Sequence, residues 1–265
     1  MKSFDFSGKN VLIRVDFNVP QDENLNITDN TRIKAALPTI MKVIEGGGKA
    51  VLMSHLGRPK GERVAKLTLS SLVDEVSALT GTKVHFAQDC IGDKAAEAIS
   101  AASNGEIVLL ENLRYYNEET SGDKEFAASL AELGDIYLND AFGTAHRAHA
   151  SMAVVTKYVD QCAAGFLLEK EIEYLGKTLE APEKPFVAII GGAKISGKID
   201  VVINLMDKCD KILIGGGMAY TFYKAMGKEI GGSLVEDDKV ELAGQILKQA
   251  EEKGVELLLP IDNTV

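Results

Sequence analysis

The 265-residue sequence has few cysteines, and their positions exclude several classes of protein. Cys90, Cys162 and Cys209 are far apart, odd in number and in no CxxC pair. Such cysteines form neither the framework of a disulfide-rich secreted domain nor a zinc site. We therefore expect reduced thiols in a cytosolic protein that has no metal site.

The sequence also lacks an excess of basic residues. It carries 29 lysines and arginines against 39 aspartates and glutamates, a net charge of −10. A general nucleic-acid surface needs a basic stripe, so we expect no nucleic-acid partner. A local arginine cluster can still reverse the field in one cleft, so an anionic small ligand remains possible.

Long apolar runs are missing as well. The first ten residues, MKSFDFSGKN, contain no apolar region of the kind found in secretory signals. No run approaches the roughly 18 apolar residues of a membrane span. These absences predict a cytoplasmic protein without a membrane partner.

Short apolar runs alternate with helical patterns along the chain. In the first part, strands are expected at 9–15, 49–53, 83–86, 106–110 and 136–138, and helices at 31–45, 69–79, 93–102 and 124–133. In the second part, strands are expected at 186–190, 211–214 and 255–260, and helices at 165–181, 199–209, 219–226 and 240–253. Strands that alternate with helices predict the α/β class, with parallel sheets covered by helices on both faces.

Polar side chains follow the expected strands of the first part. They are Asp16, Asn18, His55, Arg58, Asn112, Arg114, Asn139, Asp140, His146 and Arg147. Right-handed crossovers bring the carboxyl ends of parallel strands to one rim, where α/β proteins bind ligands. Each of these residues taken alone could instead be a solvated surface group. The segment 138–151, LNDAFGTAHRAHAS, could likewise be a turn with two surface histidines.

The arginines of this rim suggest a ligand with more than one negative charge. Guanidinium groups bind carboxylate and phosphate at two points, which lysine cannot do. Arg32, in the first turn of an expected helix, joins Arg58, Arg114 and Arg147, and His55 and His146 could add donors. The alternative for each arginine is a surface ion pair, which contributes little.

Two glycine-rich turns follow strands in the second part, at 191–198 and 215–217. A glycine turn before a helix exposes backbone N–H groups that bind phosphate. Neither turn matches the dinucleotide or Walker A fingerprint, and the motifs of protein kinases are absent. Lys194 and Lys198, four positions apart, could share a helix face and direct charge at a polyphosphate. The residues alone indicate a small-molecule phosphotransferase.

Seven segments carry a resemblance to a known family. They are VDFNVP (15–20), SHLGRPKG (54–61), LLENLRYYNEE (109–119), LNDAFGTAHRAHAS (138–151), GFLLEKEI (165–172), GGAKISGKI (191–199) and GGGMAYTF (215–222). In this order and over the whole chain, they resemble phosphoglycerate kinase. The resemblance implies reversible phosphoryl transfer from 1,3-bisphosphoglycerate to ADP, giving 3-phosphoglycerate and ATP, with magnesium, in glycolysis.

The resemblance also assigns expected site residues. The substrate-binding residues are Asp16, Asn18, Arg32, His55, Arg58, Arg114, His146 and Arg147. Lys194, Lys198, Gly215, Gly216 and Gly217 belong to the nucleotide side, and Arg32 and Lys194 are expected to be catalytic. Gly197 stands where many members have aspartate, so the local turn is expected to differ.

The resemblance further implies a Rossmann-like substrate domain (1–164), an interdomain helix and hinge (165–185) and a partial nucleotide-binding domain (186–265). Family members continue past residue 265, so we expect a C-terminally truncated chain whose missing part carries the magnesium-binding aspartate. The parent is expected to be a monomer. Two alternatives to an enzyme are a fragment that binds 3-phosphoglycerate without turnover and a folding fragment that associates through a sheet edge.

Overall fold

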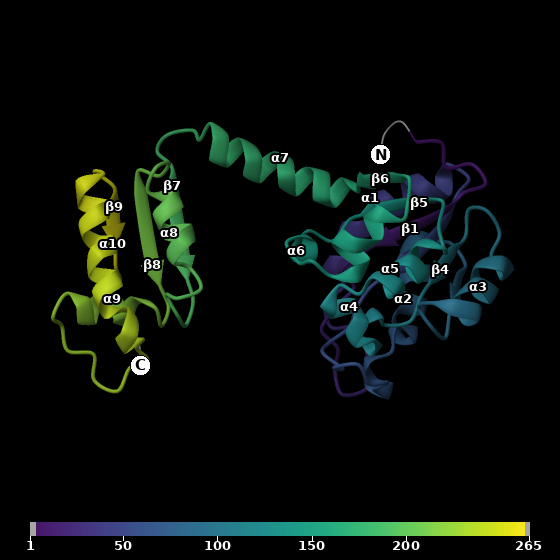
Figure 1. Ribbon diagram of the computed structural model, residues 1–265, viewed down its shortest axis with the longest axis horizontal. Helices are drawn as coiled ribbons and strands as arrows, with labels where there is room; N and C mark the ends of the chain where they lie inside the picture. The colour runs from purple at the N-terminus through teal and green to yellow at the C-terminus, as the bar shows by residue number, and fades with distance from the viewer. Residues whose placement is uncertain (1–3, 263–265) are drawn as a thin grey trace. The chain divides into compact units, whose positions relative to one another are not determined.

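The computed structural model describes residues 4–262 and divides into two units, Met1–Glu173 and Tyr174–Val265, which are described separately (Figure 1). The division falls within α7 (Phe166–Glu180), close to the helix predicted at 165–181.

Unit 1 contains a six-stranded sheet. Its strands are β1 (Asn10–Arg14), β2 (Lys49–Met53), β3 (Val84–Phe86), β4 (Ile107–Leu109), β5 (Ile136–Asn139) and β6 (Gln161–Ala164). Its helices before α7 are α1 (Thr31–Glu45), α2 (Val73–Thr80), α3 (Gly92–Ala101), α4 (Asn117–Ser121), α5 (Lys124–Ala131) and α6 (Phe142–Ala145). The first five strands lie within one residue of their predicted ends. The sequence did not predict β6, because QCAA contains no β-branched residue and its extended form comes from pairing with β5.

All pairs in this sheet are parallel, and the strand order is β3-β4-β2-β1-β5-β6. Side chains alternate between two buried faces. Val11 and Ile13 of β1 pack in one apolar cluster with α1 and α2, whereas Leu12 packs in the other with α3 and α5. Helices therefore cover both faces, as the sequence predicts.

Unit 2 contains a smaller parallel sheet in the order β7-β8-β9. Its strands are β7 (Val187–Gly191), β8 (Lys211–Gly215) and β9 (Glu256–Leu258), and its helices are α8 (Ile199–Leu205), α9 (Ala219–Ala225) and α10 (Val240–Glu252). Successive right-handed crossovers in one direction bring helices to the same face of a sheet. Ile190 and Ile212 are accordingly buried in the core with α8, α9 and α10, whereas Val187 and Ile189 are exposed. The predicted α/β class with two parallel sheets is confirmed.

Candidate active site

The strand order of unit 1 places a crevice at the carboxyl ends of its central strands. From β1 the chain continues to β2 on one side, while β5 lies against β1 on the other side. Loops that leave neighbouring strands in opposite directions open a crevice in which α/β proteins bind ligands. The segments that follow β1, β2, β4 and β5 all reach this edge.

A cavity of about 280 Å³, here called the rim cavity, lies at this edge. It is lined by Asp16, Asn18, Arg32, His55, Gly57, Arg58, Arg114, Gly143, Thr144 and Arg147. The structure thus brings together every substrate-site residue expected from the sequence except one. His146 is exposed after α6 and is not among the lining residues.

Hydrogen bonds fix the loops that carry the rim cavity. Arg32 Nη1 lies 3.0 Å from Asp16 Oδ2, so this carboxylate orients a half-exposed guanidinium. Asn18 Oδ1 accepts a hydrogen bond of 2.8 Å from the backbone N–H of Gly57. The loops after β1 and β2 are therefore joined at the cavity.

Arg114 is the most enclosed of the lining arginines. It lies in the short helical turn η3 (Leu113–Tyr115), and its Nη1 donates to Gly57 O at 2.9 Å. Burial, followed by the charges of Arg14 and Arg147, lowers its pKa. Its Nε is buried without a hydrogen-bond partner among the described residues. Arg114 thus has an unused donor in a region that repels further positive charge.

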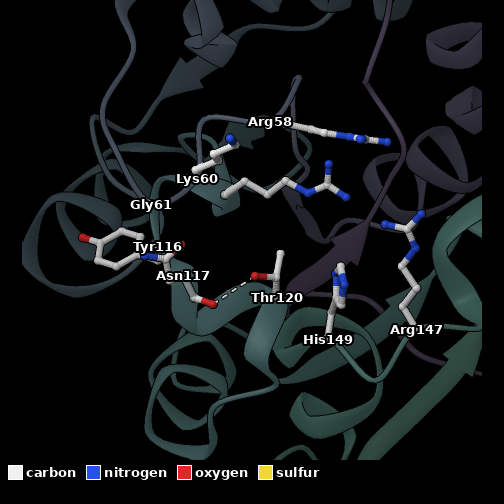
Figure 2. A pocket seen from close by; sticks show the side chains of 9 residues that line it. Arg58, Lys60, Gly61, Tyr116, Asn117, Thr120, Arg147 and His149 are labelled. Atoms are coloured by element: carbon white, nitrogen blue, oxygen red, sulfur yellow. Dashed lines mark hydrogen bonds between the residues drawn. The ribbon is translucent and has the colours of Figure 1, made fainter.

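A second cavity of about 370 Å³, here called the outer cavity, adjoins the first through Arg58, Arg114 and Arg147. Its other lining residues are Lys60, Gly61, Tyr116, Asn117, Thr120 and His149. Figure 2 shows the guanidinium groups of Arg58 and Arg147 at the same end of this cavity, with the His149 ring nearby. Both cavities are therefore suited to anionic groups.

A buried polar cluster, which no sequence pattern predicted, lies beside the cavities. Arg14, Glu119 and Ser151 are fully buried, and the cluster reaches His55. Burial, followed by the charges of Arg14, Arg114, Arg147 and Arg32, lowers the pKa of His55 from 6.5 to about 2. The one signal in the sequence was an arginine inside an otherwise apolar strand.

The two glycine-rich turns of unit 2 lie side by side after β7 and β8. Gly216 has a φ of +70°, and a Cβ there would lie 2.9 Å from Gly192 O. The expectation that Lys194 and Lys198 share a helix face is wrong, because both precede α8, which begins at Ile199. Both lysines are exposed.

The carboxylate of Glu236 accepts hydrogen bonds from two backbone amides at the first glycine turn. Its Oε2 accepts hydrogen bonds from the N–H groups of Ile195, at 2.6 Å, and Ser196, at 3.1 Å. These two amides are therefore already bonded within the protein, and the exposed Lys194 and Lys198 carry positive charge at this turn.

Two kinds of feature are absent from the described residues, 4–262. These residues contain no group of three or more histidine, cysteine, aspartate or glutamate side chains placed to hold a metal ion. They also contain no helix of the length and apolarity that a bilayer crossing requires.

The fold and the rim cavity define an α/β protein with an arginine-rich cavity at the switch point of a parallel sheet. A sequence model of the family described as Phosphoglycerate kinase matches residues 1–265. The chain belongs to the phosphoglycerate kinase family.

Individual relatives agree with this assignment. The chain is 58% identical over 258 residues to "Phosphoglycerate kinase" of Chlorobium chlorochromatii (strain CaD3), covering 97% of this chain and 65% of the relative. It is 55% identical over 261 residues to the protein of that name from Synechococcus elongatus, covering 98% of this chain and 65% of the relative. The chain therefore spans about two thirds of the length of these relatives.

Solved structures give the same result. Phosphoglycerate kinase from Coxiella burnetii matches with a TM-score of 0.82 at 40% identity, over 98% of this chain and 65% of that one. The enzyme from Pyrococcus horikoshii OT3 matches with a TM-score of 0.85 at 30% identity, over 98% of this chain and 67% of that one.

Proposed function

We propose that the chain acts in reversible phosphoryl transfer from 1,3-bisphosphoglycerate to ADP, which gives 3-phosphoglycerate and ATP in glycolysis. Family membership and the names of the relatives support this reaction. The observation that carries the proposal is the rim cavity, where four arginines and His55 surround about 280 Å³. Guanidinium groups bind carboxylate and phosphate at two points, so several arginines around one cavity suit a substrate that has both groups.

In this proposal the rim cavity binds 3-phosphoglycerate. Asp16 and Asn18 hold the polar glycerate part, and His55, Arg58, Arg114 and Arg147 surround the charged groups. Arg32 lies at the start of α1 and is oriented by Asp16. It can therefore stabilise the negative charge that develops on the reacting carboxyl group. Stabilisation of that charge by fixed cations is the main protein contribution to phosphoryl transfer.

The nucleotide side of the proposal rests on unit 2. Lys194 stabilises the transferred phosphoryl group, Lys198 binds nucleotide phosphates, and Gly215, Gly216 and Gly217 leave room beside the nucleotide. Magnesium bound with ATP or ADP supplies further positive charge to the phosphate oxygens. We also propose that the segment 165–185 is an interdomain helix and hinge.

The alternative is a chain that binds 3-phosphoglycerate without turnover. A coupled assay of ATP and 3-phosphoglycerate consumption, run with a direct binding measurement, separates the two. If the chain turns over, the rate should be lost in both Arg32→Ala and Lys194→Ala, whereas binding of 3-phosphoglycerate should be lost only in Arg32→Ala. Lys248→Ala, which changes an exposed lysine on α10, is the matched control and should behave as the wild type. Binding without turnover would select the alternative, and neither binding nor turnover would overturn both.

A further inference from the structure

The buried guanidinium of Arg14 uses each of its nitrogens inside unit 1. Arg14 ends β1 on the same face as Leu12, because side chains alternate along a strand. Its Nε donates to Ser151 Oγ at 3.0 Å, and its Nη1 donates to the carbonyl of Val15. Its Nη2 lies 3.1 Å from His55 Nδ1. Arg14 lines neither cavity, so its effect on a ligand must pass through another residue.

A carboxylate compensates the charge of Arg14 through one hydroxyl group. Ser151 Oγ accepts from Arg14 and donates to Glu119 Oε1 at 2.7 Å, while the Ser151 N–H donates to Glu119 Oε2 at 2.9 Å. The phenol of Tyr137 donates to Ser151 O at 2.9 Å and fixes this peptide. A buried charge is tolerated when it is bonded and paired in this way. The guanidinium therefore has a fixed position.

This position determines the protonation of the His55 ring. A guanidinium carries donors and no acceptor, so His55 Nδ1 must accept the hydrogen bond and cannot itself carry a proton. The neutral ring then carries its hydrogen on Nε2. An imidazolium would place two N–H groups against each other, at a site where burial and nearby charges already lower the pKa of His55 to about 2. The charged groups that act on the ring are Arg14, Arg32, Arg114 and Arg147.

We propose that Arg14 is a positioning residue that holds His55 in the neutral tautomer with hydrogen on Nε2, so that the ring is a permanent hydrogen-bond donor to an anionic oxygen in the rim cavity. An unrestrained histidine has two neutral tautomers, only one of which donates from Nε2, and it titrates between about pH 5 and pH 8. Arg14 removes both sources of variation. The anion named under the proposed function is 3-phosphoglycerate, and only the identity of the ligand rests on that proposal.

The test is nuclear magnetic resonance of the imidazole nitrogens in the ligand-free protein with isotope-labelled histidine. His55 signals are assigned with His55→Gln, and the exposed His146 is the internal control. We expect His55 to show a protonated Nε2 and an unprotonated Nδ1 without change from about pH 5 to pH 8. A protonated Nδ1, or titration of His55 in this range, would overturn the proposal without any variant of Arg14.

Two variants then separate positioning from general stability. Arg14→Met removes the donor at similar size, and we expect mixed tautomers, a titrating His55 and affinity for 3-phosphoglycerate lowered by about tenfold, the value of one charged hydrogen bond. Ser151→Ala breaks the bridge to Glu119 but leaves the Nη2 donor, so it should reduce stability while His55 keeps its tautomer. Loss of the tautomer in Ser151→Ala but not in Arg14→Met would contradict the proposal. A correct tautomer without 3-phosphoglycerate binding would refute only the proposed function.

Discussion

Gly165 leaves no space for a Cβ atom, which would overlap with Asp140 Oδ1. Asp140 follows β5 and is fully buried, and its Oδ1 accepts hydrogen bonds from the N–H groups of Leu167 and Leu168 at the start of α7. Thr39 of α1 accepts from Phe166 N at 2.8 Å in the same place. Hydrogen bonds thus join the start of α7 to the end of β5 and to α1 within unit 1.

Gly165→Ala should therefore destabilise the protein. The added methyl group meets a buried carboxylate, and overpacking of this kind costs about 1–3 kcal/mol. Gly176→Ala is the matched control, because among the described residues no atom beyond the chain neighbours and the nearby backbone of α7 lies within 4 Å of a Cβ at that position. The control should gain about 0.5–1 kcal/mol from helix propensity. Urea unfolding followed by circular dichroism measures both changes, and equal effects would contradict the close approach.

Asp140→Asn should change how stability depends on pH. Burial raises the pKa of Asp140 above its usual value, and its Oδ2 has no partner among the described residues. The folded protein therefore holds this proton more tightly than the unfolded chain, so the Asp140 contribution to stability falls as pH rises from about 4 through the raised pKa. Asparagine does not titrate.

The expected result is that Asp140→Asn becomes progressively more stable relative to the wild type between about pH 4 and pH 7. The free energy of unfolding of both proteins, measured in urea at several pH values, gives this difference directly and cancels the other carboxylates. A difference that stays constant with pH would show that Asp140 does not ionise in this window.

Arg14 and Glu119 should be energetically coupled through Ser151. Burial alone would raise the pKa of Glu119, but the neighbouring His149, Arg14 and Ser151 together hold it below the usual value. Its contribution to stability is therefore present above the unfolded pKa and lost as pH falls through the lowered one. Each of Arg14→Met and Glu119→Gln leaves a buried partner uncompensated, at a cost of about 3–5 kcal/mol.

The double variant should cost less than the sum of the two single changes, by about 0.5–3 kcal/mol. A double-mutant cycle on the free energy of unfolding measures this coupling. Additive changes would show that the hydroxyl of Ser151 does not transmit the interaction.

Much of this fold follows from local patterns. The β-branched runs predicted five strands of unit 1 and three of unit 2, and the parallel arrangement placed their polar neighbours at one edge. Most of the rim cavity could therefore be predicted from the sequence. His146 and His149 show the limit, since both follow an alanine in the same segment but only His149 lines the outer cavity and His146 lines neither cavity. The path of the chain after Thr144 determines which histidine faces the cavity. The three-residue spacing of the two histidines does not predict that path.

The buried cluster has no local signal. Arg14 and Ser151 are 137 positions apart, and only the pairing of β1 with β5 and the packing of η4 (Ala150–Val154) bring them together. The glycine turn of unit 2 is similar, because Glu236 reaches its amides from 41 positions away. Long-range hydrogen bonds of this kind depend on the tertiary fold, not on residue spacing.

We propose that the rim cavity binds 3-phosphoglycerate, and calorimetric titration of the chain with this compound at low and at higher salt measures that binding. We predict saturable binding that weakens as salt rises, because the exposed charges of Arg32, Arg58 and Arg147 are screened. Binding should be lost in Arg32→Ala and retained in a control that changes the exposed Lys94 of α3. A folded protein that gives no saturable heat, or whose affinity does not change with salt or with Arg32→Ala, would contradict the claim.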